Sequence, residues 1–310
     1  MKKILTAAAT VSGAALLVLA TAAPAGAIVG GAPDEGEHPY VGQLLFYVPD
    51  APDPRFTDPG GWFTCTGTLI DADTVITAGH CTYDVGLDGV APADPLGGGN
   101  DVWFSVEEVP DFSVLPPSSG FVPDRNAERY EAWAGALDAS PTWYAAETVW
   151  THPEYDDASF FLHDVGMFQL AEPIVLDSYA ELPTEGYLDQ YQRSARNDAV
   201  FETVGYGLEG SGPKTSFGGD TRMKADRYLV SLNGVYGYRD IVANFSHSPG
   251  RGGGTCFGDS GGPTFDNTGT DGTGTVLVTV TSFGMTLTCT TGGYYRIDQP
   301  DDLEFIASHL

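Results

Sequence analysis

The sequence has 310 residues, of which 42 are acidic and 14 are Lys or Arg, so its formal net charge at pH 7 is −28. That sign excludes a basic nucleic-acid-binding surface. Hydrophobic residues make up 42% and charged residues 18%, which permits a folded core and excludes wholesale disorder. With 40 Gly and 21 Pro the chain is rich in turns, which favours short strands and excludes a long helical bundle.

The first element in chain order is a predicted signal peptide. Lys2 and Lys3 precede an apolar run at residues 4–20, and Ala25-Gly26-Ala27 supplies the small residues of a cleavage site. An uncleaved membrane anchor is the alternative, because about 20 apolar residues can span a bilayer, but alanine and threonine dilute this run. We therefore expect residues 1–27 to be removed and the protein to be secreted, extracellular and free of the membrane.

Cleavage after residue 27 removes two lysines and no acidic residue, so the mature chain is more negative by two than the −28 of the full sequence. A well-hydrated extracellular surface explains this acidity. Adaptation to high salt, where screening relieves the self-repulsion, explains it as well. Composition alone does not separate the two explanations.

Short β-type runs separated by turn clusters follow along the chain, and they indicate an all-β fold. A single helix is expected near the C-terminus, where Asp301 and Asp302 precede a periodic apolar face. Residues 49–61 and about 83–141 are too long for ordinary connections, so we expect surface insertions there, the second of which contains a strand. The expected strands lie at residues 41–48, 63–70, 74–77, 102–106, 148–150, 165–170, 199–204, 227–232, 240–245, 275–283 and 293–297.

Four cysteines in an exported chain indicate two disulfides, for which three pairings are possible. The local pairing joins Cys65 to Cys81 and Cys256 to Cys289. Zinc ligation is the alternative use of these side chains, but the sequence has no Cys-x-x-Cys pair.

Three motifs carry the chemistry: Thr77-Ala78-Gly79-His80-Cys81, His163-Asp164-Val165-Gly166-Met167 and Gly258-Asp259-Ser260-Gly261-Gly262-Pro263. Their order is His, Asp, Ser, and Ile28-Val29-Gly30-Gly31 stands at the expected start of the mature chain. With these motifs, residues 28–310 resemble secreted, bacterial-type serine proteases of the chymotrypsin/trypsin family. The serine motif is very specific and the histidine motif strongly so, whereas the aspartate motif alone is weak.

The resemblance implies an all-β fold of two packed antiparallel six-stranded barrels with a short C-terminal helix and the active site between the barrels. Residues 28–182 would form the first barrel, with the histidine, the aspartate and the insertion at about 83–141. Residues 183–310 would form the second barrel, with the serine, the oxyanion hole and the primary specificity pocket. No metal or organic cofactor is required, the substrates are polypeptides, and we expect a monomer.

The resemblance also implies the roles of the catalytic residues. His80 would act as the general base and then as the general acid, and Asp164 would orient its imidazole. Ser260 would be the nucleophile, and the backbone N–H groups of Gly258 and Ser260 would form the oxyanion hole. Asp156 and Asp157 are the competing acids, but the strand that follows Asp164 favours Asp164. The other five histidines are expected to be structural or solvated.

Two further expectations concern activation and specificity. By resemblance, the new α-ammonium of Ile28 would insert beside Asp259 and order the oxyanion hole, and export itself would release that terminus. The implied pocket has no carboxylate at its base to pair with Arg or Lys. Its wall has Thr281 where glutamate-selective relatives have a histidine. The pocket therefore suits Phe, Tyr, Leu or Met before the scissile bond rather than Arg, Lys or Glu. The implied pocket residues are Gly254, Thr255, Phe257, Ser282, Phe283, Gly284 and Gly293.

The function that follows is a secreted serine endopeptidase that works through an acyl-enzyme. A catalytically silent relative that binds a partner through the same scaffold is the alternative from another class, although such proteins usually lack a member of the triad. An esterase with the same triad is a third hypothesis. A serine-directed reagent and paired ester and amide substrates separate the three.

Overall fold

The computed structural model describes residues 28–48, 61–83, 85, 102–117, 126–191, 199–211, 216–232, 242–245, 254–270, 274–284, 289 and 292–310. The predicted signal peptide and parts of both predicted insertions lie outside these residues. Among the helices in the described ranges, none has the length and apolar character needed to cross a bilayer.

The first half of the chain forms a closed antiparallel barrel in the order β2-β3-β4-β7-β6-β5. The sequence predicts all six of these strands, with shifts of a few residues at their ends. Alternating apolar residues of the strands fill the interior, and Leu44, Val75, Phe104 and Phe168 are fully buried there. The strands are β2 (Val41–Val48), β3 (Gly61–Leu69), β4 (Thr74–Thr77), β5 (Val102–Ser105), β6 (Tyr144–Thr151) and β7 (Gly166–Leu170).

The second half forms an eight-stranded antiparallel sheet in the order β1-β11-β8-β14-β15-β16-β13-β12. This differs from the predicted six-stranded barrel, because β1 extends one end of the strand order and the short β12 extends the other. The strands are β1 (Ala32–Pro33), β8 (Phe201–Gly205), β11 (Met223–Arg227), β12 (Leu229–Ser231), β13 (Val242–Phe245), β14 (Pro263–Asp266), β15 (Leu277–Gly284) and β16 (Gly292–Arg296). A separate two-stranded sheet pairs β9 (Leu208–Ser211) with β10 (Ser216–Gly218).

The described residues form two α-helices, so the expectation of a single helix is wrong. The unexpected helix, α1 (Asn126–Asp138), lies in the second insertion, where alanine, glutamate and leucine have high helix propensity without a clear apolar stripe. Its Leu137 joins a cluster with Leu45, Trp103 and Trp143 on the outside of the first barrel. The expected C-terminal helix is α2 (Pro300–Ala307). Short 3₁₀ helices lie at η1 (Gly79–Cys81), η2 (Phe112–Val114), η5 (Asp157–Ser159) and η6 (Tyr187–Tyr191).

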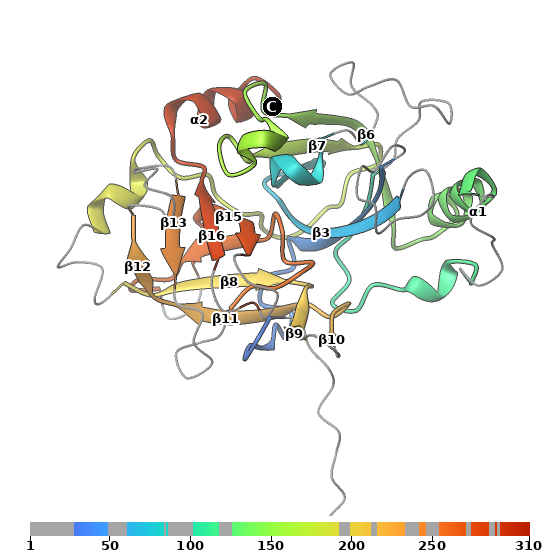
Figure 1. Ribbon diagram of the computed structural model, residues 1–310, viewed down its shortest axis with the longest axis horizontal. Helices are drawn as coiled ribbons and strands as arrows, with labels where there is room; N and C mark the ends of the chain where they lie inside the picture. The colour runs from blue at the N-terminus through green and yellow to red at the C-terminus, as the bar shows by residue number, and fades with distance from the viewer. Residues whose placement is uncertain are drawn as a thin grey trace, which may run out of the picture.

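Each end of the described chain contacts the opposite half. Near the start, β1 pairs with β11 of the second sheet. At the end, α2 lies beside β6 and β7 of the first barrel (Figure 1), where the Phe305 ring lies 5.1 Å from that of His152. The two halves are therefore tied together by both terminal segments, and the domain boundary at residues 182/183 stays a prediction.

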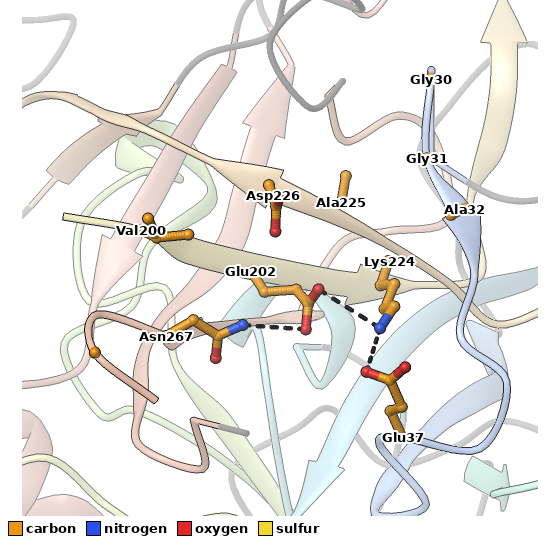
Figure 2. A pocket seen from close by; sticks show the side chains of 11 residues that line it. Gly30, Gly31, Ala32, Glu37, Val200, Glu202, Lys224, Ala225, Asp226 and Asn267 are labelled. Carbon is orange, nitrogen blue, oxygen red and sulfur yellow. Dashed lines mark hydrogen bonds and ion pairs between the residues drawn. The ribbon is translucent and has the colours of Figure 1, made fainter. Parts of the chain in front are cut away.

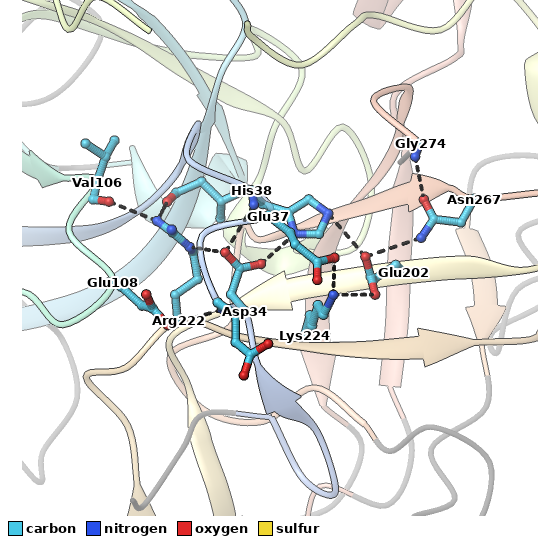
Figure 3. Close-up of polar contacts among 12 residues, drawn as sticks. Asp34, Glu37, His38, Val106, Glu108, Glu202, Arg222, Lys224, Asn267 and Gly274 are labelled. Carbon is cyan, nitrogen blue, oxygen red and sulfur yellow. Dashed lines mark hydrogen bonds and ion pairs between the residues drawn. The ribbon is translucent and has the colours of Figure 1, made fainter. Parts of the chain in front are cut away.

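A buried ionic network anchors the N-terminal segment to the second sheet (Figure 3). The guanidinium of Arg222 donates to Asp34 Oδ2 at 2.8 Å. The imidazole of His38 lies between two carboxylates, with Nδ1 2.5 Å from Asp34 Oδ1 and Nε2 3.2 Å from Glu202 Oε1. Lys224 contacts Glu37 and, at 3.9 Å, Glu202. A neutral imidazole carries one N–H, so both contacts of His38 are hydrogen bonds only when the ring is protonated.

This network makes a prediction about pH. Burial lowers the pKa of His38, but hydrogen bonds and charges from Asp34 and Glu202 outweigh burial and raise it above 6.5. Protonated His38 then stabilises the fold below pH 6.5, and the contribution is lost as the pH rises through the folded-state pKa. The His38→Gln variant should be less stable than the parent by on the order of 1–3 kcal/mol at low pH, and by less at higher pH. Denaturant unfolding across pH measures this, and a gap independent of pH would contradict it.

Candidate active site

His80 is positioned by the element that follows β4. It lies in the single turn of η1, next to Cys81, and the disulfide between Cys65 and Cys81 fastens this turn to β3. The His80 backbone N–H donates to Asp164 Oδ1 at 2.9 Å, and its ring Nδ1 lies 3.1 Å from both Asp164 oxygens. The His80 side chain remains 28% exposed, so Asp164 holds the Nδ1 edge of the ring while part of the ring stays accessible to solvent.

Asp164 is fully buried at the entry to β7. Besides His80, it accepts a 2.5 Å hydrogen bond from the hydroxyl of Ser282 on β15. The competing acids have other partners: Asp156 caps η5, and Asp157 accepts from the Tyr155 hydroxyl at 3.2 Å. The structure therefore brings Asp164, rather than its neighbours, against His80.

Ser260 lies in a tight turn before β14. Gly258 has a φ of 98°, a conformation that favours glycine, and a Cβ there would lie 2.9 Å from the Cα of Gly207. Thr66 of β3 holds this turn from the other half of the chain, since its N–H donates to Ser260 O at 2.8 Å and its hydroxyl donates to Gly258 O at 2.9 Å. The second disulfide, between Cys256 and Cys289, begins beside the same turn. The local pairing of the four cysteines is thus confirmed.

The serine turn packs directly against the end of β4. A Cβ at Gly261 would overlap the Thr77 hydroxyl and the Ala78 nitrogen, which precede His80 in the chain. No hydrogen bond joins Ser260 to His80 among the contacts of the described residues. The serine and histidine motifs therefore adjoin each other, whereas the histidine and aspartate are already in contact.

The environment of His80 favours its protonated form. Burial lowers its pKa, but the charge and hydrogen bond of Asp164, followed by the charge of Asp157, raise it above 6.5 in net. A base with such a pKa is suited to accept a proton from a hydroxyl near neutral pH.

The predicted activation pair is not in contact in the described residues. Ile28 is fully buried against Met223 and Ala225, and the next residue, Val29, pairs with Gly254. In the full chain the Ile28 nitrogen is an uncharged peptide nitrogen. Asp259 accepts from the backbone N–H groups of Cys256 at 2.7 Å and Gly207 at 2.8 Å. Burial raises the pKa of Asp259 to about 7, although both N–H groups and the charge of Arg227 lower it.

A cavity of about 150 Å³ lies beside Ser260. Five of the seven predicted pocket residues line it, namely Thr255, Phe257, Ser282, Phe283 and Gly284, together with Cys256, Thr281 and Cys289. The other two, Gly254 and Gly293, are absent from the lining that the structure describes. Gly254 forms the bridge to Val29, and Gly293 pairs with Phe283. A Cβ at Gly293 would overlap the ring of Phe283, which lines the cavity, and the hydroxyl of the next residue of β16, Tyr294, lies 2.7 Å from that of Thr255.

A larger cavity of about 740 Å³ lies beside β1 and β11 (Figure 2). Glu202, one of its lining residues, contacts both Lys224 and Asn267. None of the predicted catalytic residues lines this cavity. Cavity volume therefore does not select the predicted catalytic residues, whereas the His80–Asp164 contact brings two of them together.

Two groups of side chains in the described ranges hold potential metal ligands within 4.8 Å of one another. The first is His80 with Cys65 and Cys81, whose sulfurs are joined in a disulfide and are not thiolates. The second is His152, His163 and Asp301. The two imidazoles of that group stack at 4.8 Å with an interplanar angle of 14°, so their in-plane lone pairs do not converge. Neither group is a preformed metal centre.

Three residues around the candidate site were either not predicted from the sequence or were predicted in another role. Thr66 is not part of any motif, and its link to the serine turn depends on the packing of the two halves. Ser282 was predicted only as a pocket wall, yet its hydroxyl binds Asp164. Arg227 is fully buried behind Tyr294, and no sequence signal pointed to it.

Comparisons with known proteins agree with this geometry. The model of the family described as Trypsin matches residues 28–98 and 123–302. A solved structure titled HL collagenase has a TM-score of 0.59 and 16% identity, covering 91% of this chain and 98% of that one. A scabies mite inactivated protease paralogue, S-D1, has a TM-score of 0.56 and 17% identity, covering 91% and 97%. At such identities the likeness establishes the fold, and the predicted chymotrypsin-like fold class is confirmed. A search of curated proteins found no match.

The Ser282 contact leads to a prediction for the Ser282→Ala variant. A hydrogen bond to a buried carboxylate contributes roughly 1.5–3 kcal/mol, so its loss should lower kcat/KM about tenfold to a hundredfold. Steady-state kinetics on a peptide substrate measures this effect. Ser113→Ala, which removes an exposed hydroxyl, is the control. Equal activity of the two variants would show that Asp164 does not need this donor.

Proposed function

Because the chain belongs to the trypsin family, we propose that it is a serine endopeptidase that hydrolyses peptide bonds through an acyl-enzyme. The observation that carries this proposal is the contact of His80 Nδ1 with both oxygens of the buried Asp164, beside a cavity that contains Ser260. The substrates are polypeptides.

Each side chain has a role in this reaction. His80 Nε2 removes the proton from the Ser260 hydroxyl as its oxygen attacks the substrate carbonyl carbon, and it then delivers this proton to the leaving amine. Asp164 keeps the Nδ1 proton of His80 in place and stabilises the imidazolium. The backbone N–H groups of Gly258 and Ser260 donate to the oxyanion of the tetrahedral intermediate. Water, activated by His80, hydrolyses the acyl-enzyme in the same way.

Two alternatives retain the same scaffold. One neighbouring structure is titled an inactivated protease paralogue, so a silent binding protein is one of them. The presence of His80, Asp164 and Ser260 together favours catalysis. Labelling of Ser260 by a serine-directed phosphonate supports the enzyme, whereas a folded protein that resists labelling supports the binding protein. Cleavage of esters without amides would identify an esterase.

We propose a large apolar or aromatic residue before the scissile bond. A cavity of about 150 Å³ holds a benzene-sized group, and the cavity beside Ser260 has this volume. None of the described lining residues is charged, so a buried Arg or Lys side chain would find no counter-ion there. Cleavage profiling on a peptide library tests this preference.

The proposed setting is extracellular. The predicted signal peptide at residues 1–27 and the two disulfides suit an exported protein, and we propose that it acts as a monomer. Cleavage at residue 27 would create the α-ammonium of Ile28 that pairs with Asp259.

The proposed general base makes a prediction for the pH profile. The pKa of His80 is raised above 6.5, so kcat/KM should fall as the pH drops through this raised pKa and the ring becomes protonated. Replacing Asp157, whose charge contributes to the shift, by Asn should move this acidic limb to lower pH. Asp156→Asn, which changes a neighbouring carboxyl group that does not act on His80, is the matched control. Full activity at pH 4 would contradict the assignment of His80 as the general base. Equal acidic limbs of the pH profile in both variants would contradict the influence of Asp157 on the pKa of His80.

The activation step makes a second prediction. In a chain extended upstream of Ile28, the raised pKa of Asp259 means that stability decreases as the pH rises from 3.8 towards about 7. A chain that begins at Ile28 should lose this dependence, because the α-ammonium favours the carboxylate. Ser260→Ala versions of both chains, with and without Gly26-Ala27, can be compared by thermal unfolding across pH. Identical curves would argue against the ion pair, as would a secreted protein that begins upstream of Ile28.

A further inference from the structure

The backbone bends sharply just before the buried Asp164. His163 has a φ of 51°, in the left-handed region that few residues other than glycine adopt. The N–H of Val165 donates to the carbonyl oxygen of His163 at 2.8 Å, so the chain makes a three-residue turn with Asp164 at its centre. The direction in which the Asp164 side chain leaves the backbone, and hence its contact with His80, therefore depends on this bend.

The ring of His163 is held by two other segments of the chain. Its Nε2 lies 3.3 Å from Glu154 Oε2 in the loop after β6, and its Nδ1 lies 3.3 Å from Asp301 Oδ2 in the first turn of α2. The ring also stacks on the buried ring of His152 at 4.8 Å. A left-handed residue costs roughly 1–2 kcal/mol and persists where its surroundings hold it, and these contacts are what holds it here.

We propose that His163 is a positioning residue for the reaction, whose left-handed bend aims the Asp164 carboxylate at His80. The contacts of its ring with the loop after β6 and with α2 hold this bend. The proposal rests on the proposed endopeptidase function. Helix α2, at the far end of the chain, thereby helps to arrange the reactive groups without touching them.

The competing explanation is a purely structural role, in which His163 only fastens α2 to the first barrel. Loss of the ring would then lower the stability of the fold and leave the contact between Asp164 and His80 unchanged. The pKa of His80 separates the two roles. Burial lowers this pKa, but the charge and the hydrogen bond of Asp164 raise it in net, so a displaced Asp164 would let it fall.

The test compares two replacements of His163 in the mature enzyme. Valine, with its branched Cβ, resists a positive φ and should release the bend, whereas asparagine adopts the left-handed conformation more readily and should keep it. Because a misplacement of about 1 Å can cost a hundredfold in rate, we expect His163→Val to lower kcat about tenfold to a hundredfold with little change in KM. His163→Asn should retain most of the parental kcat on the same peptide amide.

A second readout does not depend on catalysis. In Ser260→Ala versions of the three proteins, an NMR titration follows the imidazole of His80. The pKa of His80 should be lower in His163→Val than in the parent, and His163→Asn should restore the parental value. In the active enzymes, the acidic limb of the kcat/KM profile should move in the same direction.

Glu35→Val is the matched control, because Glu35 has a φ of 54° and is exposed in a turn of the N-terminal segment. It places the same backbone strain away from the site, so it should lower the free energy of unfolding and keep the parental kcat. If His163→Val does not fold, His163→Ala, which resists the left-handed conformation less strongly, must show the same changes.

Four outcomes would overturn the role of His163: a parental kcat in the valine variant, an equal loss of kcat in both His163 variants, an equal loss in Glu35→Val, or an unchanged pKa of His80. Each of them leaves the proposed function intact. Absence of peptide cleavage by the parent, with no labelling of Ser260, would instead overturn the proposed function, while the titration of His80 would still show whether His163 positions Asp164.

Discussion

The buried carboxylate of Asp164 is the constraint on which the rest of the site depends. A charge removed from water is costly unless it accepts several hydrogen bonds. Asp164 receives them from both halves of the chain, since His80 belongs to the first barrel and Ser282 to the second sheet. Neither half alone supplies all of these donors. The site can therefore form only when the two halves are joined.

The contacts that join the halves are the ones that place the reactive groups. Thr66 on β3 binds two carbonyl groups of the turn that carries Ser260. The first disulfide holds the turn of His80 against the same strand. One strand of the first barrel thus holds the turns that carry the proposed nucleophile and the proposed base. The crossed terminal segments, β1 on the second sheet and α2 on the first barrel, close the assembly from both ends.

The sequence predicted the parts of the fold that depend on local patterns. Short β-type runs between turn clusters located the strands at residues 41–48 and 74–77. Short motifs identified Ser260, His80 and Asp164 as candidates. It missed α1, because this helix shows propensity without an apolar stripe. It named Gly293 as a pocket wall, and the ring of Phe283, which lines the cavity, occupies the space that a Cβ of residue 293 would fill. It could not find Thr66 or Arg227, since their importance arises from residues far apart in the chain.

Buried arginine side chains pair with carboxylates in the interior of this acidic protein. Arg222, Arg227 and Arg296 are all nearly or fully buried in the second half. Arg222 binds Asp34 of the N-terminal segment, and Arg296 binds Asp298 beside its own strand. These guanidinium groups connect segments through several donors at once, which an ammonium does less well. Because these cations lie inside, they do little to neutralise the surface. Salt also screens the long-range attraction of cationic substrates, so we expect the uncharged cavity beside Ser260, rather than the overall field, to decide which peptide bonds the proposed endopeptidase cleaves.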